Sequence, residues 1–138
     1  MSELNETLKK WRHTLHRHPE TAFQEVQTAA FVAERLREMG MEVFTGIGKT
    51  GVVGRLKVGE GDRTVALRAD MDAIHLTEET DLPYKSECSG NMHACGHDGH
   101  TTTLLGAAKL LAETRDFEGT VLFLFQPAEE PGKGAHAM

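Results

Sequence analysis

The chain has 138 residues, with 15 Lys or Arg and 21 Asp or Glu, and a formal net charge of -6 at pH 7. Its 39% hydrophobic and 26% charged residues are ordinary for a globular protein and exclude the disordered and fibrous classes. A chain of this length can bury a core without disulfides or a structural metal. The acidic balance and the lack of any Lys/Arg cluster argue against a nucleic-acid partner.

The chain also carries no signal for a membrane or an oxidising compartment. Residues 1–10 are polar, unlike the apolar core of a signal peptide, and no apolar run is long enough to span a bilayer. The two cysteines, Cys88 and Cys95, are too few for a disulfide framework. We therefore expect a cytoplasmic protein with no membrane partner, in which Cys95 is available as a thiolate ligand.

Apolar periodicity predicts two helices at the start of the chain. Residues 4–17 carry apolar side chains at helical spacing, and His18-Pro19 interrupts the pattern. A second helix is predicted from residue 23 to 39, because Thr21 to Gln24 has the form of a capping box and Gly40 marks the end.

Beyond Gly40 the period changes to that of strands. The runs at 51–58 and 64–71 follow a shorter one at 41–44 and should pair as a hairpin across the turn at 59–62. A helix is then predicted over 100–113, followed by a continuous apolar strand over 120–125. Strand, helix and strand make a βαβ unit, so the predicted class is α/β, with a mixed, mostly parallel sheet flanked by helices.

Residues with metal-binding and acid–base chemistry collect at one edge of this predicted sheet, where open α/β sheets form ligand sites. They are Asp70 and Asp72 at the end of one strand, Cys95 and His97 before the helix, and Glu129 and Glu130 past the last strand. Thiolate, imidazole and carboxylate donors suit a divalent metal such as zinc, and hydrolysis also needs a free carboxylate as a base. The sequence therefore predicts a catalytic metal site.

Each of these residues also has a plainer interpretation. Cys95 alone would be a small buried hydrophobe, but with His97 two residues away we favour a ligand pair. His93 and His100 are weaker candidates, since His100 could simply cap its helix.

The carboxylates have alternatives too. Glu129 and Glu130 could be a solvated surface pair. On an extended backbone adjacent residues point opposite ways, which suits one glutamate on the metal and one on the attacking water. Asp72 could hold the tautomer of a ligand histidine or cap a turn.

Four ordered motifs, at residues 15–20, 67–73, 93–100 and 126–130, resemble those of the aminoacylase-like metallopeptidases. The nearest branch is the one with hippurate hydrolases, indole-acetyl-amino-acid hydrolases and N-acetyl-diaminopimelate deacetylases. The resemblance implies a zinc-exopeptidase-like catalytic domain with two divalent ions, zinc or manganese, per complete active site. It also implies an amidohydrolase whose partner is a small-molecule substrate, an N-acyl amino acid.

Carried over to this sequence, the resemblance assigns a role to five residues. Cys95 is the shared metal ligand, His97 a ligand of one metal and Glu130 a ligand of the other. Glu129 is the general base toward a metal-activated water, and Asp72 is the orienting aspartate.

Members of that family run to several hundred residues, with a lid and dimerisation domain. The resemblance therefore implies that residues 1–138 are the N-terminal portion of an incomplete catalytic domain, whose full-length form is a homo-oligomer. Two alternatives stay open: a non-catalytic metal-binding fragment, and a cysteine hydrolase with Cys95 as nucleophile.

Overall fold

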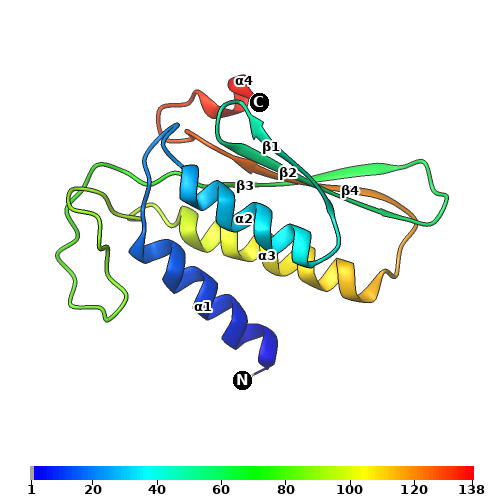
Figure 1. Cartoon of the computed structure of the whole chain (residues 1–138), viewed down its shortest axis with the longest axis horizontal. Helices are drawn as coiled ribbons and strands as arrows, with labels where there is room; N and C mark the ends of the chain where they lie inside the picture. Colours follow the sequence, from blue (N-terminus) through cyan, green and yellow to red (C-terminus); the bar gives the residue numbers. More distant parts are fainter. Residues whose placement is uncertain (1) are drawn as a thin grey trace.

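The computed structural model describes residues 2–138 as a four-stranded sheet with its three long helices on one side (Figure 1). Helices α2 and α3 pack on the sheet, and α1 packs on α3. No helix within residues 2–138 has the length and apolar character needed to cross a membrane. In chain order the elements are α1 (Glu3–Arg17), α2 (Val26–Glu38), β1 (Glu42–Ile47), β2 (Gly51–Val58), β3 (Thr64–Asp70), α3 (His97–Thr114), β4 (Gly119–Gln126) and α4 (Gly134–Ala137).

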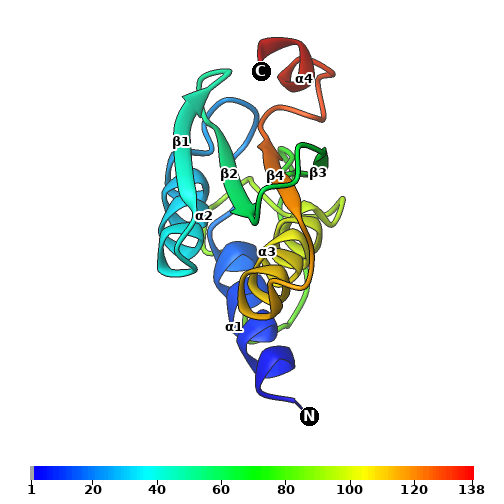
Figure 2. The ribbon, with the colours of Figure 1, turned by 90° about the vertical axis from the view of Figure 1, so that its right-hand side faces the viewer.

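The strands lie side by side in the order β1-β2-β4-β3 (Figure 2). This confirms the mixed α/β class, but the predicted hairpin between β2 and β3 is wrong, because β4 lies between them and β2 forms its hairpin with β1. The reason is burial: β4 is the most continuous apolar run and takes the centre, where Phe123 and Phe125 are fully buried. Among the described strands only the β3–β4 pair is parallel, so the expectation of a mostly parallel sheet is also wrong for these residues.

The core lies between the sheet and the two helices that cover it. Val52 and Phe125 face each other across β2 and β4, and both are completely buried. Gly54 of β2 lies directly under Leu36 of α2, where an added Cβ would come within 3.0 Å of the Leu36 Cδ1 atom. This close approach lets α2 pack flat against the sheet.

Helix α2 does not begin with the predicted capping box. Phe23 has a positive φ of 61°, and Thr21 pairs with Ala73 in an isolated bridge. The helix start is held from outside by Glu20, whose carboxylate accepts hydrogen bonds from the backbone N–H groups of Gln27 (3.0 Å) and Thr28 (2.6 Å). A charged acceptor at a helix N-terminus also interacts favourably with the helix dipole.

We predict that Glu20→Ala lowers the free energy of unfolding by about 1–2 kcal/mol, the usual cost of losing an N-terminal cap. Denaturation in urea measures the change, and Glu60→Ala, in the exposed turn after β2, is the control. Equal stability of the two variants would show that Glu20 does not anchor α2.

Candidate metal centre

The candidate site lies where β3 and β4 end. These strands are parallel and in register, with Asp70 opposite Gln126, so both deliver their following residues to the same edge of the sheet. Helix α3 begins at this edge with His97, rather than at His100 as its periodicity predicts. The helix is preceded by Gly96, whose φ of 100° favours glycine. Three segments far apart in the sequence therefore meet here.

His97 is the buried centre of this site. Its Nδ1 atom lies 2.8 Å from the backbone oxygen of Asp72 and 3.1 Å from Oδ1 of the same residue. The other carboxylate oxygen of Asp72 accepts a hydrogen bond of 3.0 Å from the backbone N–H of Glu130. An imidazole held at Nδ1 by an oxygen acceptor presents Nε2 as a ligand, which is the usual arrangement around a metal-binding histidine.

The donor atoms of Cys95, His97 and Glu130 lie within 4.8 Å of one another. The three donors come from the loop after β3, the first turn of α3 and the loop after β4. A thiolate, an imidazole and a carboxylate are the ligand types that zinc takes, and three protein ligands are usual in a catalytic site. The residues present therefore fit one divalent ion.

Negative charge surrounds the free nitrogen of His97. Carboxylate oxygens of Asp70, Glu129 and Glu130 lie 3.6, 3.5 and 3.7 Å from Nε2. Burial alone would lower the pKa of His97, but the carboxylates of Asp72 and Asp70 outweigh burial and raise this pKa to about 9. The surroundings of Nε2 thus favour a positive charge, as a cation site requires.

The loop that carries Glu129 and Glu130 is a turn, so the expectation that an extended backbone points them apart is wrong. Both carboxylates lie near His97. The turn starts at Ala128, whose φ is 47° and whose backbone N–H donates to Glu25 at 2.8 Å. Glu25 is fully buried, so it anchors the turn from the side of α2. Glu130 belongs to the donor set, and Glu129 lies beside it.

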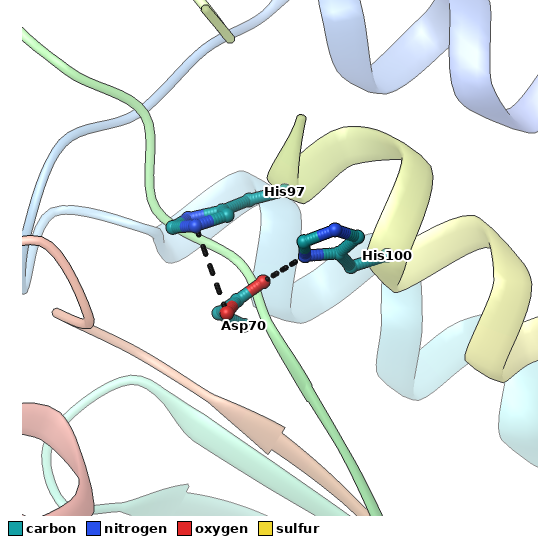
Figure 3. Close-up of side chains that lie close together, drawn as sticks. All are labelled: Asp70, His97 and His100. Carbon is teal, nitrogen blue, oxygen red and sulfur yellow. Dashed lines mark hydrogen bonds and ion pairs between the residues drawn. The ribbon is translucent and has the colours of Figure 1, made fainter. Parts of the chain in front are cut away.

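A second possible donor set shares His97 with the first and adds Asp70 and His100 (Figure 3). The carboxylate of Asp70 lies between the two rings, with His100 Nδ1 at 2.7 Å from Oδ1. Arg68 donates a hydrogen bond of 2.9 Å from Nη1 to the other oxygen of Asp70, Oδ2. Because both oxygens of Asp70 already have partners, we favour the Cys95 set. The i, i+3 spacing of His97 and His100 on one helix is the sequence signal for this second group.

Four further histidines, His16, His75, His93 and His136, lie outside both donor sets. His93 is buried, and burial lowers its pKa to about 4, so it is neutral at pH 7. His16 is buried between two carboxylates. His75 and His136 are exposed.

The fold and the donor set together define an α/β domain with a candidate metal centre at the carboxyl ends of its parallel strands. Residues 66–138 match the model of peptidase family M20/M25/M40, and the chain belongs to this family. This confirms the resemblance to the aminoacylase-like metallopeptidases.

Relatives of known name are similar over almost the whole chain. The hippurate hydrolase of Campylobacter jejuni is 55% identical over 136 residues, which cover 99% of this chain and 35% of that protein. The N-acyl-L-amino acid amidohydrolase of Geobacillus stearothermophilus is 47% identical over 141 residues, which cover 100% of this chain and 38% of that protein. The crystal structure of the Bacillus subtilis YXEP protein, described as a dinuclear metal binding peptidase from the M20 family, has a TM-score of 0.93 at 43% identity. That match covers 97% of this chain and 38% of the other. The chain thus spans about a third of the length of the relatives it matches.

We predict that Cys95→Ala and His97→Ala each lose most of the bound metal, because either change removes one of the three donors of the candidate set. Cys88→Ala is the matched control, since Cys88 belongs to neither donor set. Metal content of the purified variants, measured by elemental analysis, checks this. Equal content in all three would rule out the Cys95 site.

Proposed function

We propose that this chain provides part of the active site of a metal-dependent hydrolase that cleaves the amide bond of N-acyl amino acids. The observation that carries the proposal is the His97 arrangement. Asp72 holds Nδ1, Nε2 lies 3.5 Å from Glu129 and 3.7 Å from Glu130, and Cys95 completes the donor set with His97 and Glu130.

Within this proposal, Cys95, His97 and Glu130 hold a divalent ion, zinc or manganese, in a complete site of two ions. When bound, such an ion polarises the amide carbonyl and lowers the pKa of water. Asp72 fixes His97 from behind and, through its bond to the Glu130 backbone, also fixes the turn that carries both glutamates. The buried Asp72 is thus a positioning residue that touches two parts of the site.

Glu129 is the residue that we assign to proton transfer. Its side chain is 39% exposed, compared with 3% for His97, so it can reach both water and a substrate. Its position beside the donor set leaves its carboxylate free to take a proton from the attacking water. The same oxygen then returns the proton to the amide nitrogen as the bond breaks.

The substrate class comes from the relatives. Two of them are named for hydrolysis of hippurate and of N-acyl-L-amino acids, and at 55% and 47% identity they share this region closely. Other relatives are named carboxypeptidases, which also cleave an amide next to a free carboxylate. The shared chemistry is therefore an acyl group joined by an amide to an amino acid.

A thiol hydrolase is a weaker alternative. Hydrogen bonding to the Glu130 carboxylate, burial and the charge of Glu129 raise the pKa of the Cys95 thiol. A nucleophilic cysteine needs the opposite, a lowered pKa next to a cation. The surroundings of Cys95 suit a metal ligand better.

We predict that Glu129→Gln in the protein at its full natural length lowers the rate of hydrolysis of an N-acyl amino acid at least ~10²-fold. Metal content should stay nearly unchanged, because Glu129 is not in the donor set. Steady-state kinetics and elemental analysis on the same preparation measure both effects. Full activity in this variant would end the general-base assignment.

We also predict that residues 1–138 alone show no significant hydrolysis, even with added zinc or manganese. The two donor sets in the described residues share His97, so they cannot fill two positions independently. The alternative of a non-catalytic metal-binding fragment predicts the same lack of turnover. Steady turnover that is lost on chelation and restored by metal would contradict it.

A further inference from the structure

A second group of ionisable side chains, most of them buried, lies outside the two donor sets. His16 of α1 lies between two carboxylates, with Nδ1 at 2.7 Å from Asp98 and Nε2 at 3.2 Å from Glu78. The side chains of His16, Glu78 and Asp98 are only 3%, 2% and 0% exposed. Arg12 donates to the same oxygen of Asp98 at 3.0 Å. None of these residues belongs to either donor set.

This group connects the two segments that carry Cys95 and His97, the two donors of the first set that lie closest together in the sequence. Asp98 follows His97 in the first turn of α3. Glu78 lies in the long irregular segment at 71–96, which projects beyond the helices in Figure 1 and leads into Cys95. Within that segment Glu78 accepts from the Thr80 hydroxyl at 2.5 Å and from the Ser86 N–H at 2.6 Å. His16 therefore joins the irregular segment to the helix.

The link between Cys95 and His97 has little packing of its own. Cys95 is exposed, and a Cβ added at Gly96 or at Gly99 would meet no atom within 4 Å. The Gly96 carbonyl accepts hydrogen bonds from the N–H groups of Gly99 and His100, but the left-handed backbone of Gly96 is conformationally permissive. Contacts of the segments on either side therefore help to set the relative position of the two donors.

Fold stability alone gives a poor reason for burying these charges. Removing ionised groups from water is costly, and a buried ion pair is often no more stabilising than apolar residues of similar size. Burial acts to raise the pKa of Glu78, but hydrogen bonds from Thr80, Ser86 and His16 outweigh it and lower that pKa. Glu78 is therefore a carboxylate at neutral pH, and one of its oxygens lies 3.2 Å from His16 Nε2.

We propose that His16 is a positioning residue for the metal centre: by joining Glu78 to Asp98, it holds Cys95 and His97 at a spacing that one divalent ion can bridge. This inference rests on the proposed function, since it takes Cys95 and His97 as ligands.

The test compares zinc affinity with fold stability in the protein at its full natural length. His16→Leu removes both contacts, while His16→Gln keeps one donor. Zinc affinity is measured by competition with a chromophoric chelator, below the unfolding temperature of every variant. We expect affinity to fall about 10- to 100-fold in His16→Leu, the range for residues that orient ligands, and less in His16→Gln.

The control is Val121→Ala, a buried change at the other end of β4 that also lowers stability, but Val121 pairs with Leu56 and Val65, far along the strands from Asp70 and Gln126. Its zinc affinity should stay within about twofold of the parent, well short of the loss expected for a positioning residue. With Co²⁺ in place of zinc, the absorption from its bond to the Cys95 thiolate should weaken or shift in His16→Leu and stay unchanged in Val121→Ala. If His16→Leu does not fold, Arg12→Met, at the 39% exposed end of the group, should weaken zinc binding in the same direction.

Unchanged zinc affinity in the His16 or Arg12 variants, or an equal loss in Val121→Ala, would overturn the positioning role and leave the proposed function standing. Failure of the parent protein to bind metal through Cys95 would overturn both.

Discussion

The carboxylate of Asp72 is completely buried, and each of its two oxygens contacts a different part of the candidate site. One oxygen lies 3.1 Å from His97 Nδ1, and the other accepts the backbone N–H of Glu130. A buried carboxylate is tolerated only when its oxygens have partners, and here both have one. The hydrogen bonds that these partners provide outweigh burial and lower the pKa of Asp72, so it stays ionised. The same residue thus ties the end of β3, the start of α3 and the turn after β4 into one site.

That role depends on the order of the strands. Because β4 lies between β2 and β3 and is parallel to β3, the residues after Asp70 and after Gln126 emerge side by side. Had β2 and β3 formed a hairpin, the two carboxylate-bearing segments would not have been neighbours in the sheet. The fully buried Phe123 and Phe125 hold β4 at the centre, so apolar burial in the strand determines where the polar site can form.

Local patterns predict much of this molecule and miss what depends on distant contacts. The apolar periodicity of residues 4–17 and the run at 120–125 predict α1 and β4, and the strand ends indicate the correct edge for the site. The pairing of β2 could not be read from its turn, because β4, the strand that displaces β3, lies more than sixty residues farther along the chain. The Glu20 cap and the His16 bridge are missed for the same reason, since their partners are not at a fixed local spacing.

The central claim is that the thiol of Cys95 and the imidazole of His97 bind one ion. X-ray absorption at the zinc edge, on zinc-loaded residues 1–138 carrying Cys88→Ala, tests it most directly because Cys95 is then the only cysteine of these residues. We predict one sulfur neighbour at about 2.3 Å together with nitrogen and oxygen neighbours at about 2.0–2.2 Å. A zinc shell of nitrogen and oxygen alone would contradict this account of the site.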